Sequence, residues 1–243
     1  MKFKRSGLPA FVCLISLALI LIFYAPFIFT ASAAEYDQSL APGDMITFGH
    51  YEQDNDMNNG AEAIQWRVLA REGDKALVIT EHNLDTEPYN TSGTAVTWEG
   101  CYLRSWLNND FLNAAFTQAQ QDAILTTTLK NEDNPVFGTD GGLDTRDKMF
   151  LLSIAEAENL FQSDEDRVAK RTTYAEWQCA STNDNGAGWW WLRSPGYYRN
   201  VAAYVYTDGS VGRDGWDVRN TLGAVRPALW LDLTSEIFTS EAP

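Results

Sequence analysis

The sharpest pattern in the chain is the run Gly-Trp-Trp-Trp-Leu-Arg-Ser-Pro-Gly, which begins at position 188. Side chains alternate between the two faces of a strand, so Trp189 and Trp191 would share one face and Trp190 would take the other. A strand with large apolar side chains on both faces needs cover on both, which predicts a central position in a sheet. The Pro-Gly pair at 195–196 predicts a turn that ends the strand.

Alternating apolar positions predict further strands before this run. Met45–Phe48 reads as a first strand. Ile64–Ala70 and Ala76–Thr80 read as two strands joined by a turn at Arg71–Lys75, which contains a Gly-Asp pair.

The segment after the tryptophans predicts a hairpin and a closing strand. Val201–Tyr206 reads as a strand, Asp208 and Gly209 as a turn, and the chain returns at Val211. Arg213–Gly223 is rich in loop-forming residues, and Val225–Leu233 reads as one apolar strand that closes the domain.

Between these strands the apolar spacing changes from two residues to that of a helix. The i, i+3, i+4 spacing predicts a helix whose buried face holds Leu103, Trp106, Leu107, Phe111 and Ala115. Two shorter helices are predicted by capping boxes, Thr117 with Gln120 and Ser153 with Glu156.

The segments around these helices have mixed character. Asn131–Asp147 contains Pro and several Gly residues and predicts a long loop. Lys148–Leu152 reads as a strand, and the charged segment Ser163–Ala175 is expected to be exposed. Strands are followed by helices and then by strands again, without β-α-β alternation. This order predicts an α+β fold with mainly antiparallel pairing.

The beginning of the chain has the composition of an export signal. Three basic residues among the first five precede an apolar run from Leu8 to Thr30, and small residues of the cleavage-site type follow. An uncleaved membrane anchor is the alternative, since about 20 apolar residues span a bilayer. Either interpretation predicts a protein that is secreted or held at the cell surface. We expect a signal peptide or anchor over 1–34, a short tail over 35–43, a single domain over 44–234, and a C-terminal tail over 235–243.

The net charge of the chain limits the classes of partner that it can bind. The chain has a formal net charge of −15. Loss of the signal would remove three bases and no acid, which leaves −18. Such a chain is repelled by nucleic acid and by anionic membrane surfaces, so we expect no nucleic-acid partner and membrane contact only through a retained N-terminal segment.

Two cysteines, Cys101 and Cys179, remain after the signal. A disulfide is permitted outside the cytoplasm. It also requires the two Cα atoms to lie close together, which the sequence does not establish. A bridge and two free thiols therefore both stay open.

Metal ligands are scarce. His50 and His82 are the only histidines, so a Cys/His site has few members. The loop Asp54–Gly60 alternates Asp and Asn as calcium loops do, but its glycine comes one residue late and the closing Glu is missing. We expect a plain hairpin loop there, with no metal and no other cofactor.

Several short sequence motifs, called boxes below, follow one another along the chain. They are Phe-Gly at 48, Ile-Gln-Trp-Arg-Val-Leu at 64, Leu-Arg-Ser-Trp-Leu-Asn at 103, Phe-Leu-Leu-Ser at 150, Trp-Leu-Arg-Ser-Pro-Gly at 191, Ala-Ala-Tyr-Val at 202, Asp-Gly-Ser-Val at 208 and Val-Arg-Pro-Ala-Leu-Trp-Leu at 225. This order, from Met45 to Leu233, closely resembles a family of secreted bacterial domains of unknown function. The resemblance carries no activity with it.

More distantly, the pattern is similar to the C-type-lectin-like fold of formylglycine-generating-enzyme-type domains and of the variable proteins of diversity-generating systems. Arg193-Ser194 and Val225-Arg226 take the places of that fold's Arg-Ser box and closing strand. The resemblance implies a twisted antiparallel sheet flanked by two or three helices, with ligand-facing loops between the boxes. The Glu-Pro-Asn and Trp-Asn-Asp triplets of calcium-dependent lectins and the paired C-terminal cysteines of the oxidase are missing here, so neither activity is implied.

The two predicted loops between the last boxes carry residue types that anchor recognition surfaces. We favour a binding face there for an extracellular protein or glycan, without catalysis. The alternative is a purely structural role, in which Trp216 and a tyrosine fold back onto the core while the rest is solvated loop. The candidate residues are Tyr197, Tyr198, Arg199, Asn200, Arg213, Asp214, Trp216, Asp217, Arg219 and Asn220.

Other candidates favour structure over chemistry. Trp189–Trp191 could stack on sugars, but a tryptophan run in a predicted central strand is more often part of the core. Arg193 and Arg226 could hold an anion, but we expect them to bond buried carbonyls, because arginine has five donors. Ser194 and Ser210 lack the Gly-x-Ser-x-Gly context of a nucleophile. A secreted hydrolase that uses a carboxylate pair and a structural cell-envelope protein are the alternatives, and we rank both below binding.

Overall fold

The computed structural model describes residues 40–239, which form an α+β fold with mostly antiparallel sheets, several short helices and one longer helix. The predicted signal segment and most of the tail before position 44 lie outside the described residues. Within residues 40–239, no helix is long and apolar enough to cross a membrane.

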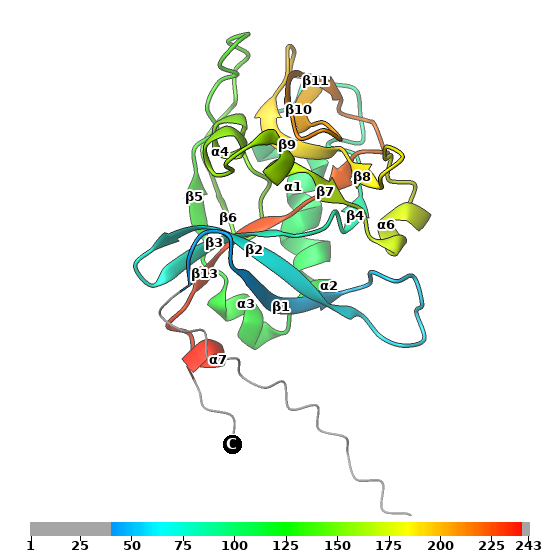
Figure 1. The fold of residues 1–243 in the computed structure, drawn as a ribbon. Helices are drawn as coiled ribbons and strands as arrows, with labels where there is room; N and C mark the ends of the chain where they lie inside the picture. The colour runs from blue at the N-terminus through cyan, green and yellow to red at the C-terminus, as the bar shows by residue number, and fades with distance from the viewer. Residues whose placement is uncertain (1–39, 240–243) are drawn as a thin grey trace, which may run out of the picture. The chain divides into compact units, whose positions relative to one another are not determined.

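A four-stranded antiparallel sheet contains the N-terminal strands and ends on a C-terminal one (Figure 1). Its order is β1-β2-β3-β13. The strands are β1 Met45–Tyr51, β2 Glu62–Glu72, β3 Lys75–Thr80 and β13 Ala228–Asp232. The first three confirm the predicted strands, and the loop between β1 and β2 contains the polar segment that was expected to be a hairpin loop.

A five-stranded sheet has the order β11-β10-β9-β12-β4, and Figure 1 shows β9, β10 and β11 in yellow to orange. β9 pairs with β12 in parallel, and the other neighbours are antiparallel. The strands are β4 Asp85–Thr86, β9 Trp190–Pro195, β10 Val201–Val205, β11 Val211–Asp217 and β12 Ala224–Val225. The tryptophan strand is therefore central, as predicted.

The three tryptophans divide between the two faces as the alternation predicts. The rings of Trp189 and Trp191 meet edge to face with centroids 4.8 Å apart. Trp190 is buried on the other side, where its indole nitrogen donates to the carbonyl of Arg167 over 3.2 Å. Both faces of β9 are covered, which explains why it tolerates an unbroken apolar run.

The prediction of one closing strand over Val225–Leu233 was wrong. The chain forms β12 in the five-stranded sheet and then β13 in the four-stranded sheet, with Arg226 and Pro227 between them. Proline has no amide hydrogen to give to a ladder, so the run breaks there. This crossover joins the two sheets.

One longer helical segment runs from Tyr102 to Ala115 and confirms the predicted helix. It is divided into α1 Tyr102–Trp106, a π-helical turn η2 Leu107–Phe111, and α2 Leu112–Ala115. A 3-10 turn, η1 Trp98–Gly100, precedes it.

Both capping boxes are present. Thr117 caps α3 Gln118–Ala123, and Ser153 caps α4 Ile154–Asn159, each with reciprocal bonds to the residue three positions on. The two short-helix predictions are confirmed.

Two other predictions need correction. Lys148–Leu152 forms no ladder; Phe150 makes one isolated bridge to Ala228, and the segment is held by burial instead. The segment Ser163–Ala175 is partly structured and buried, because Arg167 lies in the interior. The remaining elements are β5 Thr127–Leu129, β6 Thr145–Asp147, α5 Asp164–Arg167, β7 Ala169–Lys170, α6 Thr173–Trp177 and β8 Ala187–Gly188.

The expected C-terminal tail contains a helix. In α7, Glu236–Thr239, the ring of Phe238 lies 5.6 Å from that of Phe48 and is buried. The packed part of the domain therefore extends beyond position 234.

Candidate ligand-binding site

Four aromatic side chains gather on one face of the β10–β11 hairpin. Tyr204 and Tyr206 are two positions apart, so they share a face, and Trp189 and Trp216 pack against Tyr204. Ring centroids are 4.5 Å apart for the two tyrosines, 5.4 Å for Trp189 and Tyr204, and 6.0 Å for Tyr204 and Trp216. Trp189 and Trp216 are 6.1 Å apart. These are contact distances for aromatic pairs, so the four rings form one packed cluster. Tyr204 is buried in it, and Tyr206 and Trp216 are exposed.

A pocket of about 250 Å³ opens on this surface. The four rings line it together with Ser181, Thr207, Asn220 and Leu222. Trp216 is 48% exposed, which keeps the pocket open to solvent. None of these lining residues is charged.

Two glycines set the shape of the pocket. A Cβ atom at Gly212 would lie 2.7 Å from the ring of Tyr204 and 3.0 Å from that of Tyr206. A Cβ atom at Gly223 would lie 2.4 Å from Trp189 and 2.5 Å from Nε1 of Trp191. The rings can occupy their positions only because both residues lack a side chain.

The pocket is electrically neutral at ordinary pH. Burial, followed by the hydrogen bond and charge of Tyr206, raises the pKa of Tyr204, so its phenol keeps the proton. On the flanking segment, the guanidinium of Arg219 lowers the pKa of Asp217 to about 2. The two charges pair over 2.8 Å and cancel one another.

The predicted binding residues divide into three groups. Trp216 and Asn220 line the pocket, and the Asp217–Arg219 pair belongs to the segment between them. Trp216 does not fold into the core, contrary to the alternative of a purely structural role, although its ring does contact Trp189.

Tyr197 and Tyr198 form a second aromatic surface, with Phe137 of the long loop. The two tyrosine rings are 4.2 Å apart, and Phe137 meets Tyr197 at 4.8 Å. Tyr197 is 49% exposed and Tyr198 61% exposed. None of these three side chains lines the pocket.

The remaining candidates support the backbone around both surfaces. Arg199 pairs with Asp140, and Arg213 pairs with Glu158. The carbonyl of Asn200 accepts the amide of Val218 over 3.2 Å, and that of Asp214 accepts the amide of Tyr197 over 2.6 Å. Arg213, Asp214, Trp216 and Asp217 lie in β11 and not in a loop, which corrects the prediction for this segment.

Residues 73–233, more than half of the chain, match the family described as "Domain of unknown function (DUF6273)". The chain belongs to this family. The match begins in the turn before β3 and ends just after β13, so the DUF6273 region includes the whole aromatic pocket. No curated protein and no solved structure matches the chain.

Sequence reasoning missed most of the pocket of this DUF6273 domain. Trp189 was assigned to the core. Tyr204 and Tyr206 were assigned to a strand, with no prediction of which face of the strand they occupy. The signal was present, since two tyrosines at i and i+2 after an apolar strand must share a face. The residues that no pattern indicated are Ser181, Thr207 and Leu222.

Arg193 and Arg226 of the DUF6273 domain are structural, as expected. Arg226 is fully buried and donates to the carbonyls of Thr80 over 2.8 Å, Arg167 over 2.9 Å and Glu81 over 3.4 Å. Burial lowers its pKa to about 9. Arg193 pairs with Glu156 and also donates to main-chain carbonyls.

A second titratable group lies at the opposite edge of the five-stranded sheet, at β4. Asp85 is buried; one of its oxygens accepts the hydroxyl of Tyr51 and the other accepts the amide of Thr86. Burial raises the pKa of Asp85 to about 6. Burial and the charge of Asp85 also raise the pKa of Glu87, which Tyr102 contacts by a hydrogen bond. Two carboxylates with raised pKa values are therefore neighbours here.

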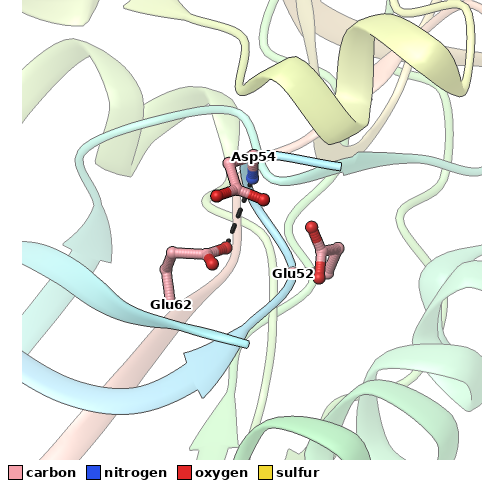
Figure 2. A group of neighbouring side chains, drawn as sticks. All are labelled: Glu52, Asp54 and Glu62. Carbon is pink, nitrogen blue, oxygen red and sulfur yellow. Dashed lines mark hydrogen bonds between the residues drawn. The ribbon is translucent and has the colours of Figure 1, made fainter. Parts of the chain in front are cut away.

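Three further carboxylates meet at the base of the β1–β2 loop, outside the DUF6273 match. Figure 2 shows Glu52, Asp54 and Glu62 around one space. Glu62 already accepts the main-chain amides of Gln53 over 2.7 Å and Asp54 over 3.3 Å. The side chain of Asp54 is also held by Asn59, whose amide donates to it over 2.7 Å. The bonds of Asp54 and Glu62 to the loop explain the grouping as a hairpin closure.

The two cysteines are not joined. Cys101 is a buried free thiol whose sulfur accepts the amide of Arg104, and burial raises its pKa to about 12. Cys179 is an exposed free thiol. A bridge needs both sulfurs in one place, and here one is inside the domain and the other at its surface.

Proposed function

We propose that this DUF6273 domain is an exported binding module that recognises an extracellular protein or glycan at the aromatic pocket, without catalysis. The observation that carries the proposal is a pocket lined by four contacting aromatic rings, of which Tyr206 and Trp216 are exposed to solvent. Aromatic side chains supply large rigid contact area at a low entropic cost, which is why they dominate recognition surfaces.

We also propose that the architecture is C-type-lectin-like. In support, Arg193-Ser194 lies on β9, Val225 lies on the adjacent strand β12 with Arg226 directly after it, and the pocket is built mainly by the chain between the two boxes. An experimental structure compared with C-type-lectin-like domains tests this. A different order of strands in the superposed sheets would overturn it.

A ligand screen with two matched variants tests the binding proposal. The panel would hold glycans, cell-wall fragments and surface proteins from the surroundings of the cell. Trp216→Ala removes the exposed wall of the pocket, and a Tyr197→Ala/Tyr198→Ala double variant removes the second aromatic surface. We expect Trp216→Ala to abolish binding while the melting temperature holds, and the double variant to bind as the wild type does.

The opposite pattern, in which only the double variant loses binding, would move the site to Tyr197 and Tyr198. A panel without any ligand would count against a binding module altogether. Export is tested by fractionation, since the proposal requires the domain to be found outside the cytoplasm.

A hydrolase is the second candidate, because Asp85 and Glu87 are neighbouring carboxylates with raised pKa values. Such pairs serve general acid–base catalysis. However, both oxygens of Asp85 are already bonded and the side chain is buried, so a substrate has no direct approach to it. Turnover of glycoside or peptide substrates that disappears in Glu87→Gln would favour the hydrolase over the binding module.

A further inference from the structure

We propose that the aromatic pocket takes a neutral pyranose ring of an extracellular glycan. This inference rests on the proposed function and narrows its ligand to one chemical class. It follows from the shape, the polar groups and the charge of the pocket lining.

The exposed rings of the pocket are Tyr206 and Trp216, whereas Tyr204 is buried beneath them and meets both edge to face. Tyr204 contacts Tyr206, Trp189 and Trp216 with centroids 4.5–6.0 Å apart, which leaves no room for a ligand between the contacting rings. A ligand must lie against the exposed rings of Trp216 and Tyr206. Pyranose rings carry faces of C–H bonds whose hydrogens are partly positive, and these are attracted to the negative face of an aromatic ring.

The lining also offers neutral hydrogen-bonding groups. The hydroxyls of Ser181 and Thr207 and the side-chain nitrogen of Asn220 make no hydrogen bond to any other residue between 40 and 239. The oxygen of Asn220 accepts the amide of Leu222 over 2.7 Å, which holds the side chain in place. Hydroxyl and amide groups beside exposed aromatic rings match the edge of a sugar, which presents hydroxyls all round.

No lining residue can neutralise a charged ligand. The lining has no Asp, Glu, Lys or Arg, and the nearby Asp217 is paired with Arg219. A sugar acid or a phosphorylated sugar would lose its hydration in the pocket without gaining a partner. The lining likewise contains no carboxylate that could hold a calcium ion, so a sugar would be held by side chains alone.

Size limits the ligand to one ring at a time. The volume of about 250 Å³ lies just below the roughly 300–1,000 Å³ of pockets for drug-sized molecules. The lining residues come from separate segments, at 181, 189, 204–207 and 216–222. They converge on a point, whereas an extended peptide needs a groove with a row of main-chain partners.

The test is a titration of the purified exported protein with the methyl glycosides of glucose, galactose, mannose and N-acetylglucosamine, followed by tryptophan fluorescence and calorimetry. Choline and glucuronic acid are the charged probes. We expect at least one neutral glycoside to bind with a Kd of about 1 mM. The Kd should be the same at about 50 mM and about 500 mM NaCl, because no charge is involved.

Trp216→Ala should weaken that binding by about tenfold or more. The matched control is Trp177→Ala, which removes another exposed tryptophan, 63% accessible, on α6 outside the pocket lining. Asn220→Ala is the second test if Trp216→Ala fails to fold, and its expected loss is roughly fivefold.

Binding of choline or glucuronic acid in place of the neutral glycosides would overturn the inference, and so would no glycoside binding at all. If a protein ligand from the wider screen still depends on Trp216, the binding module stands and only the sugar class fails. If no ligand of any kind depends on Trp216, both proposals fail.

Discussion

The two edges of the five-stranded sheet carry opposite chemistry. Beside β10 and β11 lie four contacting, uncharged aromatic rings, of which Tyr206 and Trp216 are exposed to solvent. At β4 it holds Asp85 in the interior, bonded to Tyr51 and close to Glu87. The first edge contributes little to the pH dependence of stability, and its exposed rings can contact a ligand. At the second edge, the protonation state of the Asp85 carboxyl affects how the two sheets pack together.

The crossover between the two sheets, which contains Arg226, should be the point most sensitive to substitution. Arg226→Met removes the donors from three buried carbonyls, and each acceptor left without a partner costs about 1–3 kcal/mol. Relief of a buried charge offsets part of this. We expect a loss of about 3 kcal/mol in the free energy of unfolding, or roughly 6–12 °C in melting temperature.

Urea and thermal unfolding measure this loss. The exposed Arg219→Met is the control and should change stability by less than about 0.5 kcal/mol. Equal stability of Arg226→Met and wild type would show that the three carbonyls find other partners.

The acidic edge should make stability depend on pH. Folded Asp85 keeps its proton up to about pH 6, whereas an aspartate in an unfolded chain loses it near pH ~3.9. The folded state therefore binds more protons in this window, and the contribution is full below pH ~4 and lost as pH rises through 6. Asp85→Asn lacks this titration.

We expect Asp85→Asn to gain stability relative to wild type by about 2–3 kcal/mol between pH ~4 and pH ~7.5. Urea midpoints of both proteins at the two pH values measure the gain. If the difference in stability between the two proteins is the same at both pH values, the carboxyl with the raised pKa is not that of Asp85.

A smaller effect is expected from the hydroxyl that bonds Asp85. Tyr51→Phe keeps the ring contacts with Phe111 and Tyr174 but removes the donor to the carboxylate. The loss should be about 1–2 kcal/mol near neutral pH, where Asp85 is charged, and less in acid. The same urea series would show it, and a loss that is larger in acid would contradict the assigned direction of the bond.

The smallest effect on stability is expected at the aromatic edge. Trp216→Ala removes a side chain that is nearly half exposed, so the free energy of unfolding should fall by no more than about 1 kcal/mol. The change should be equal at the two pH values, since Tyr204 stays neutral. A large or pH-dependent loss would remove the contrast between the two edges.

Local patterns predicted most strands and helices because their causes are local. The alternation around Trp190 and the boxes at Thr117 and Ser153 depend on residues within a few positions of each other. The segments that were wrong depend on distant partners. Val225–Leu233 is uniformly apolar, and only the presence of two separate sheets divides it at Pro227.

The candidate site was predicted in the same uneven way. Trp216 was found by residue type alone, and Tyr197 and Tyr198 were selected for the same reason although they lie on another surface. β10 is covered on both faces, and which side chains of the neighbouring segments meet solvent depends on the order of strands, which no local pattern encodes. Asp85 and Tyr51 come from different sheets, so their bond had no signal in the sequence.

The crossover at Arg226 and Pro227 also determines how the domain answers a pulling force. β13 is at the edge of its sheet, so tension on the chain beyond Asp232 would peel it from β3 one residue pair at a time. The peeling reaches Arg226 before it reaches β12, and there it meets a guanidinium with three bonds in the interior. We therefore expect the crossover to resist further unfolding, so that the sheet beside the aromatic pocket stays folded after β13 has detached.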